Sequence, residues 1–217
     1  MSKPAGMQVH RQHRGDSGPF LLQWVRDHVG FRVYPVHRLD KPTSGLMVFA
    51  ATSAAAATLS EAFRERQVQK SYRAIVRGHL DGDGSIDYAL GPVRDRFSTS
   101  SDEKRSAVTD YRVLQRSEVP VPVGRYQTAR YSLVDLRPRT GRRHQLRRHM
   151  KHVFHPIIGD RKYGDRDHNR FVTELGFSRL ALCSVELSID SLGISRSIPM
   201  DAELSLLANE LQLRSND

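Results

Sequence analysis

The sequence has little of what stabilises secreted proteins or anchors membrane proteins. One cysteine, Cys183, occurs among 217 residues, which excludes an internal disulfide and fits a reducing cytosol. The longest apolar run, Leu46–Ala51, is far shorter than the roughly 18 residues that a membrane span needs. The first residues, Met-Ser-Lys-Pro-Ala-Gly, lack the apolar core of a signal peptide. We therefore expect a cytoplasmic protein that does not contact a membrane.

Phosphate-binding glycine loops and sets of metal ligands are missing as well. No Gly-rich loop follows a predicted strand, which argues against a nucleotide cofactor. Histidines occur at 144, 149, 152 and 155, but His144 and His149 are five residues apart and point to different sides of a helix. Because no carboxylate or cysteine at ligand spacing completes a set, we expect no metal. We expect Cys183 to be a buried strand residue rather than a nucleophile.

Acidic residues are outnumbered, and the excess positive charge is unevenly distributed. The chain has 34 Lys plus Arg against 24 Asp plus Glu, a formal net charge of +10. A field of this sign attracts polyanions, although a basic protein can also use its charge only to stay soluble. Arginine forks fit phosphate oxygens, so a dense cluster favours RNA or DNA as the partner. The cluster consists of Arg137, Arg139, Arg142, Arg143, Arg147, Arg148 and Lys151.

Hydrophobic periodicity and turn residues predict a mixture of strands and helices. In chain order the predicted elements are a helix over 20–30, a strand over 46–50, an alanine-rich helix from 52–53, a strand over 70–76, a turn at 81–84, a polar loop over 94–105, strands over 107–113 and 131–136 connected through Pro120 and Pro122, a helix starting near 140–141, a strand over 180–187 and a helix over 201–213. Because strands and helices do not alternate regularly, we expect an α+β fold around a largely antiparallel sheet.

The segment 37–46, His-Arg-Leu-Asp-Lys-Pro-Thr-Ser-Gly-Leu, is a polar loop directly before an apolar strand. Functional residues often lie in loops that a rigid element supports. Arg38 and Lys41 flank Asp40, so the loop carries a carboxylate between two cations. From the residues alone, Asp40 is either a reacting carboxylate or an ordinary turn residue that, like Thr43, hydrogen-bonds backbone amides.

Four segments in the same order resemble the motifs of the RluA-type pseudouridine synthases. The loop 37–46 matches the family's signature loop at each defining position. Lys-Pro-Ala-Gly at 3–6, with Val9 and His10, resembles the first motif, and Lys-Ser-Tyr-Arg-Ala at 70–74 resembles the second. Thr-Gly-Arg-Arg-His-Gln-Leu-Arg at 140–147 resembles the third, followed by His-Pro-Ile-Ile-Gly-Asp at 155–160 and Tyr-Gly at 163–164. The likeness runs from about residue 3 to residue 187.

This resemblance implies a pseudouridine synthase fold over 1–217. We expect a single catalytic domain with two lobes, built on a mostly antiparallel mixed sheet with flanking helices and a central active-site cleft. No separate RNA-binding module is expected. Relatives usually have an additional strand pair before Lys-Pro-Ala-Gly, so the resemblance also predicts a shortened N-terminal edge here. Leu182-Cys183-Ser184 stands where relatives often have Leu-His-Ala, a change that we expect to affect local packing.

The resemblance also implies a reaction and roles for four residues. Pseudouridine formation breaks the N1–C1′ bond of uridine and rejoins the base through C5, an isomerisation that needs no cofactor and no metal. Asp40 matches the catalytic carboxylate, either as nucleophile at C1′ or as base at C2′. Tyr72 would stack on the uracil and Leu146 would pack on its other side. Arg147 would pair with Asp40 and aim the carboxylate.

Uridine in a folded RNA is stacked, so the enzyme must flip it out to reach C1′. Arg38 matches the family residue that intrudes into the RNA. The remaining candidate RNA-binding residues are His37, Arg142, Arg143, His144 and Arg148. The stretches 124–131 with 147–149, and 155–165 continued by Asn169-Arg170, most resemble the branch that modifies uridine 65 of tRNA. We therefore expect tRNA as the partner, with ribosomal RNA or a silent RNA-binding protein as alternatives, and a monomer.

Overall fold

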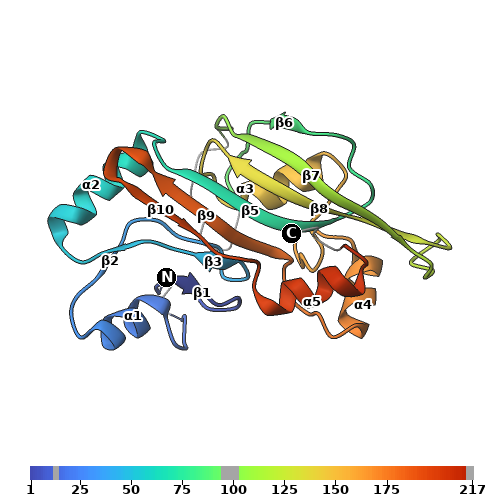
Figure 1. Ribbon diagram of the computed structural model, residues 1–217, viewed down its shortest axis with the longest axis horizontal. Helices are drawn as coiled ribbons and strands as arrows, with labels where there is room; N and C mark the ends of the chain where they lie inside the picture. The colour runs from blue at the N-terminus through green and yellow to red at the C-terminus, as the bar shows by residue number, and fades with distance from the viewer. Residues whose placement is uncertain (12–14, 94–102, 214–217) are drawn as a thin grey trace. The chain divides into compact units, whose positions relative to one another are not determined.

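Figure 1 shows the computed structural model, which describes residues 1–11, 15–93 and 103–213. The contacts divide the chain into two units, each built from two separate stretches. Unit 1 comprises Met1–Lys70 and Cys183–Asp201, and unit 2 comprises Ser71–Leu182 and Ala202–Asp217. Both contain helices and mostly antiparallel strand pairs, so the predicted α+β class is confirmed. A single catalytic domain with two lobes stays a prediction.

The described part of unit 1 consists of strands of two to eight residues and two α-helices. Its elements are β1 (Ser2–Lys3), α1 (Leu21–Val29), β2 (Tyr34–Pro35), β3 (Ser44–Leu46), β4 (Phe49–Ala50), α2 (Ser53–Arg64), β9 (Leu182–Ile189), the 3-10 turn η1 (Asp190–Leu192) and β10 (Ile194–Ser197). Strand β3 pairs antiparallel with β1 and parallel with β9. Strands β9 and β10 run side by side as an antiparallel pair (Figure 1), and β2 pairs with β4.

The core of unit 1 gathers under α2. The predicted alanine-rich helix is present, and the Thr52 hydroxyl caps it by accepting a hydrogen bond from the Ala55 amide at 3.2 Å. Cys183 is fully buried in β9, as predicted. A buried Leu, Ile or Val side chain of this core contributes about 1.5–3 kcal/mol to stability. The buried cluster consists of Ala50, Leu59, Ala62, Val68, Leu187 and Ile189.

The predicted strand over 46–50 is broken in two, which corrects that expectation. Strand β3 ends at Leu46 and β4 begins at Phe49. Met47 exchanges both backbone hydrogen bonds with Met1, each at 2.9 Å. The next amide, that of Val48, donates instead to the His37 ring at 3.0 Å. A side chain thus replaces a ladder partner at the break.

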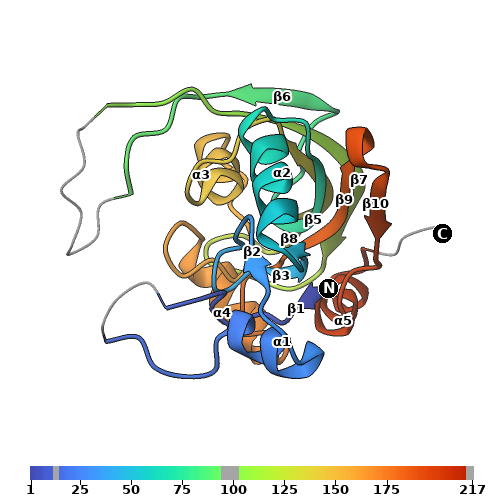
Figure 2. The same ribbon diagram turned by 90° about the vertical axis from the view of Figure 1, so that its left-hand side faces the viewer.

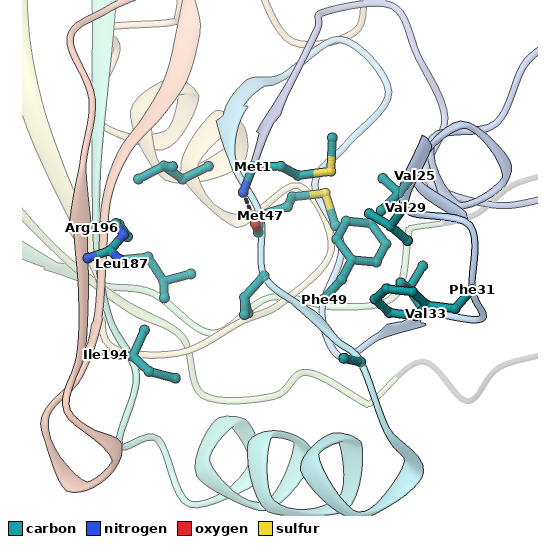
Figure 3. A pocket seen from close by; sticks show the side chains of 13 residues that line it. Met1, Val25, Val29, Phe31, Val33, Met47, Phe49, Leu187, Ile194 and Arg196 are labelled. Carbon is teal, nitrogen blue, oxygen red and sulfur yellow. Dashed lines mark hydrogen bonds between the residues drawn. The ribbon is translucent and has the colours of Figure 1, made fainter. Parts of the chain in front are cut away.

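Unit 1 also contains an apolar cavity of about 330 Å³. Figure 3 shows Leu187, Ile194 and Arg196 on one side, Val25, Val29 and Phe31 on the other, and Met1 and Met47 between them. The Met1 ammonium group donates to the Met47 carbonyl oxygen beside this cavity. Burial lowers the pKa of this ammonium group below its ordinary value.

In its described residues, unit 2 has a four-stranded antiparallel sheet and three α-helices. The strands are β5 (Gln69–Arg77), β6 (Gly84–Asp87), β7 (Val108–Val119) and β8 (Ala129–Pro138), in the spatial order β5-β8-β7-β6. The helices are α3 (Gln145–His152), α4 (Arg166–Glu174) and α5 (Ala202–Glu210). Strands β7 and β8 form the longest hairpin (Figure 1), and α3 lies against one face of the sheet (Figure 2).

Most predicted elements of unit 2 are present, with shifted bounds. Helix α3 begins at Gln145 rather than near 140–141, because the Gln145 side chain accepts from the Arg142 amide and the Thr140 hydroxyl and so shapes a loop there. Helix α5 is shorter than the predicted 201–213, and β9 replaces the strand predicted over 180–187. Residues 94–102 of the predicted polar loop lie outside the described residues. None of the described helices is long and apolar enough to cross a membrane.

Candidate active site

In unit 1 the segment 37–46 follows β2, and its last three residues form β3. Asp40 is half-buried there, and its main-chain carbonyl oxygen accepts a hydrogen bond from the Thr43 amide at 3.0 Å. This turn bond uses the backbone of Asp40 rather than its carboxylate. Gly45 has φ +107°, and a Cβ at this position would collide with the Ser184 backbone of the neighbouring strand. The loop therefore ends in a strand pairing that only glycine permits.

The ammonium group of a buried lysine binds the backbone of this loop. Lys3 is fully buried, and its Nζ donates to the carbonyl oxygens of Pro4 at 2.9 Å, Met7 at 2.9 Å and Lys41 at 3.1 Å. The Gly6 amide donates to the same Lys41 oxygen at 2.9 Å. Residues of the first motif thus fix the backbone one position after Asp40. The sequence pattern placed Lys3 in a motif but gave it no role.

His37 and Arg38 occupy different environments, although they are adjacent in the sequence. The His37 ring stacks on Phe63 with 4.7 Å between centroids, and its Nε2 accepts from the Val48 amide. Burial, together with the positive charge of Lys70, lowers the pKa of His37 to about 4, so the ring is neutral at pH 7. Arg38 is exposed. Exposure suits the predicted contact of Arg38 with RNA, whereas the contact predicted for His37 would have to come from a neutral ring.

Tyr72 lies on β5 in unit 2, opposite Leu136 of β8, and is 9% exposed. The neighbouring β5 residues form an ionic network with the buried Asp135. Arg73 Nη1 donates to its Oδ1 at 2.5 Å, and the Ser71 hydroxyl also donates to that oxygen. Arg137 Nε donates to Oδ2 at 2.9 Å. Alternation along β5 puts Tyr72 on the opposite face from this network.

Helix α3 carries Leu146 and Arg147, both 7% exposed. The Arg147 guanidinium forms a bidentate ion pair with Asp160, with Nε–Oδ2 at 2.7 Å and Nη2–Oδ1 at 2.8 Å. Burial would raise the pKa of the Asp160 carboxyl. The Arg147 guanidinium and the amides of Tyr163 and Lys162 outweigh that effect and hold the pKa below its ordinary value. Asp160 is therefore a carboxylate at pH 7.

Two buried polar side chains one turn apart attach α3 to β7. Gln145 Nε2 donates to the Val108 carbonyl oxygen at 2.9 Å and to the Thr109 hydroxyl at 3.0 Å. His149 Nδ1 lies 3.0 Å from the same hydroxyl, and its Nε2 lies 3.1 Å from the Tyr88 carbonyl oxygen. Burial lowers the pKa of His149. These bonds fix the rotation of α3 and hence the direction in which Leu146 and Arg147 point.

The other candidate RNA-binding residues cluster at the start of α3. Arg143 is exposed, and Arg142 and Arg148 are half-buried, with bonds to the Ser106 carbonyl oxygen at 3.1 Å and the Gly91 carbonyl oxygen at 2.8 Å. His144 has φ +55°, an uncommon conformation for a residue with a side chain. Its Nδ1 lies 3.0 Å from the Tyr163 hydroxyl oxygen.

The predicted site residues fall into two groups. Asp40, His37 and Arg38 belong to unit 1, whereas Tyr72, Leu146, Arg147 and the residues 142–148 belong to unit 2. The predicted pairing of Arg147 with Asp40 therefore stays a prediction. Asp160 belongs to the motif at 155–160, but the sequence predicted no role for it. The signal that could have found it is a carboxylate directly after a glycine, in a segment that resembles the same family as the segment of Arg147. No three potential ligand side chains group around a metal position in the described part of the chain.

Comparison with known proteins identifies the family. A family model described as RNA pseudouridylate synthase matches residues 1–152. The tRNA pseudouridine synthase C of Haemophilus influenzae is 52% identical over 194 residues, which cover 87% of this chain and 81% of that protein. The Yersinia pestis protein of the same name is 47% identical over 197 residues, covering 88% and 76%. The chain belongs to the RNA pseudouridylate synthase family, whose enzymes convert uridine in RNA to pseudouridine.

Solved structures agree with this assignment. Human RNA pseudouridylate synthase domain containing 4 superposes with a TM-score of 0.74 at 27% sequence identity, over 100% of this chain and 90% of that chain. Human RNA pseudouridylate synthase domain containing 1 gives 0.69 at 27% identity, over 91% and 87%. The pseudouridine synthase fold expected from the motifs is confirmed.

Proposed function

We propose that this enzyme converts a uridine of tRNA, at position 65, to pseudouridine, with Asp40 as the catalytic carboxylate. The observation that carries the proposal is the loop 37–46, in which a half-buried carboxylate lies between two basic residues and its backbone is fixed by Lys3. Relatives about half identical to this chain are named tRNA pseudouridine synthase C. Position 65 rests on the likeness of 124–131 and 155–165 to that branch of the family.

The chemistry asks for one reacting carboxylate and a site that holds a flipped base. Asp40 attacks C1′ or removes the proton at C2′, and in either route the N1–C1′ bond breaks and the uracil turns. C5 then bonds to C1′, which displaces Asp40 from C1′ in the first route and is accompanied by return of the proton to C2′ in the second; finally C5 loses its proton and N1 carries one. Tyr72 stacks on the uracil and helps the proton leave C5, while Leu146 packs on the other face of the base. Arg147 supplies the counter-charge that aims the carboxylate.

Binding depends on the basic residues around this chemistry. Arg38 is exposed in the same loop as Asp40, so we propose that it enters the RNA and occupies the place of the flipped uridine. Phosphates are contacted by Arg142, Arg143, His144 and Arg148. The contribution of these contacts to affinity falls steeply as the salt concentration rises. His37 supports the loop and touches RNA only through its neutral ring. We further propose that the enzyme acts as a monomer in the cytoplasm.

The decisive experiment maps the product on defined RNAs. Purified protein is incubated with unmodified tRNA and with unmodified ribosomal RNA, and pseudouridine is located by chemical labelling and primer extension. We expect a single new site in tRNA, at position 65, and none in ribosomal RNA. Product only in ribosomal RNA would move the substrate to the alternative class. RNA binding without any product would leave a silent RNA-binding protein instead of an enzyme.

The matched control changes only the carboxylate. Asp40→Asn keeps the side chain's size and the main-chain carbonyl that accepts from Thr43, so the loop should keep its shape. We expect turnover to fall by at least about 10⁴-fold. Affinity for tRNA, measured by filter binding, should stay within about twofold, because the phosphate contacts remain. A large loss of affinity would place Asp40 in a structural turn rather than in the chemistry.

A further inference from the structure

The Asp160 carboxylate has no part in the reaction as proposed so far, yet it forms a two-bonded contact with the Arg147 guanidinium. Its side chain is 1% exposed and that of Arg147 is 8% exposed. Nε and Nη2 of Arg147 donate to its two oxygens at 2.7 Å and 2.8 Å. Two parallel bonds of this kind fix the plane of a guanidinium as well as its position.

The backbone around Asp160 is itself fixed. Its Oδ1 also accepts from the amides of Lys162 at 2.9 Å and Tyr163 at 3.0 Å. Asn169 of α4 holds the loop from the other side, since its Oδ1 accepts from the Gly159 amide and its Nδ2 donates to the Asp160 carbonyl oxygen. Gly159 has φ +73° and leaves no room for a Cβ against Arg179. These contacts restrain the position of the carboxylate that binds the guanidinium.

Tyr163 restrains the same guanidinium from its face. The Arg147 Cζ lies 5.1 Å from the Tyr163 ring centroid, a cation–π contact. The Tyr163 hydroxyl oxygen is 3.0 Å from Nδ1 of His144, which occupies a left-handed conformation directly before α3. Oδ1 of Asp160 also accepts from the Tyr163 amide. The same carboxylate therefore binds the edge of the guanidinium and helps to place the ring that covers its face.

A buried ion pair is weak evidence of a stabilising role, because desolvation of both charges can cancel their attraction. Orientation is what this pair supplies. We propose that Asp160 is a positioning residue for pseudouridine formation, whose carboxylate fixes the orientation of the Arg147 guanidinium that the reaction uses. The inference rests on the proposed function, since it needs Arg147 to act in that reaction.

The test compares two buried aspartates with arginine partners in unit 2. Asp160→Asn keeps an oxygen for the amides of Lys162 and Tyr163 but loses the charge and one acceptor. Asp135→Asn is the matched control, because Asp135 is also 1% exposed and is bonded to Arg73 and Arg137. With enzyme in excess over tRNA, we expect Asp160→Asn to lower the single-turnover rate about 10²-fold, with affinity nearly unchanged. An equal loss in Asp135→Asn, at an equal fall in melting temperature, would reduce Asp160 to an ordinary structural residue.

A double-mutant cycle separates orientation from folding. Arg147→Lys keeps the positive charge but removes the fork that Asp160 orients. We expect a large loss of rate in Arg147→Lys and less than about a threefold further loss when Asp160→Asn is added. Independent, multiplying losses would overturn the inference. If Asp160→Asn does not fold, Arg147→Lys alone decides, because a near wild-type rate would mean that a held guanidinium is not needed.

A measurement without RNA keeps this inference apart from the proposed function. The ¹⁵N signal of Arg147 Nε–H, assigned by its loss in Arg147→Lys, should exchange slowly with solvent in the wild type and at least tenfold faster in Asp160→Asn. Equal exchange in both proteins would contradict the inference. If the wild-type enzyme forms no pseudouridine while exchange behaves as expected, Asp160 does orient Arg147, and the proposed reaction is what fails.

Discussion

The loop of Asp40 and the first turn of α3 are fixed by opposite kinds of interaction. In unit 1 a buried ammonium group, that of Lys3, donates to three main-chain carbonyl oxygens. In unit 2 a buried carboxylate, that of Asp160, accepts from the Arg147 side chain. Bonds to carbonyl oxygens fix the course of a backbone, whereas bonds between side chains fix the direction of one functional group.

The difference suits what each region contributes to the proposed reaction. Asp40 has a short side chain, so its carboxylate is placed almost entirely by the backbone that carries it. Arg147 has a long side chain with several rotatable bonds, and a fixed helix alone leaves its guanidinium free to sample many positions. A long functional side chain therefore needs a partner of its own, and a short one needs a rigid loop.

The largest effect is expected where the side-chain partnership is broken. Arg147→Ala leaves Asp160 buried without its partner, so we expect a loss of about 3–5 kcal/mol in unfolding free energy at pH 7.5. In the wild type the pKa of Asp160 is lowered, so its contribution is present above the ordinary pKa of a carboxyl and is lost only as pH falls below it. In the variant Asp160 should take up a proton more easily.

Urea unfolding at pH 7.5 and pH 5 tests this prediction. The difference in stability between wild type and Arg147→Ala should shrink at pH 5, because protonation removes the unpaired charge. Histidine titration affects both proteins and cancels in the difference. If Arg147→Ala loses the same stability at both pH values, Asp160 has found another partner in the variant. The side-chain pair would then not be what fixes this region.

The backbone partnership should cost somewhat less to break. Lys3→Met keeps a long unbranched side chain in a fully buried position but removes the Nζ donor from three carbonyl oxygens, of which that of Lys41 keeps the Gly6 amide. We expect a loss of about 3 kcal/mol and a matching fall in melting temperature. Lys41→Met, an exposed lysine of the same loop, is the control and should change stability very little. Equal melting temperatures for both variants would show that the Lys3 ammonium does not hold the loop.

The sequence predicted which segments matter better than it predicted how they are held. The ordered motifs placed Asp40, Tyr72 and Arg147 correctly on a loop, a strand and a helix, because each motif is short and local. The break at Met47 escaped prediction since it depends on Met1, 46 residues away, and on His37. The Asp160 pair escaped for the same reason: it joins a helix to a loop, and no periodicity records the contact.

A smaller effect is expected from the neutral ring of His37. Its pKa is lowered from 6.5 to about 4, so between these values the unfolded chain binds a proton that the folded protein excludes. Stability therefore falls as pH drops, by about 2 kcal/mol from pH 8 to pH 5 for this residue. His149 and His168 share the direction of the shift, so the variant His37→Gln is needed to isolate it.

Unfolding free energies of the wild type and of His37→Gln, each measured at pH 8 and pH 5, give the contribution of His37 to the pH dependence of stability. His37→Gln should lose about 2 kcal/mol less than the wild type over this interval. The control is His28→Gln, which changes an exposed histidine of α1 and should leave the interval unchanged. If the His37→Gln interval equals that of the wild type, then acid does not act on the Asp40 loop through this ring. The contrast with the acid-resistant Asp160 pair would then fail.

The smallest effect is expected at the exposed arginine of the Asp40 loop, which is the counterpart of the buried Arg147. Arg38→Ala should leave stability unchanged, because the side chain is exposed. We expect the single-turnover rate to fall about tenfold, since the variant loses part of what compensates for an unstacked base. A tRNA with 2-aminopurine beside the target uridine reports the flipping step by its fluorescence. Arg26→Ala removes an equal exposed charge from α1 of the same unit and should not slow that fluorescence change. Slowing by both variants alike would assign Arg38 to long-range attraction of the RNA, and the loop would then contribute a carboxylate but no wedge.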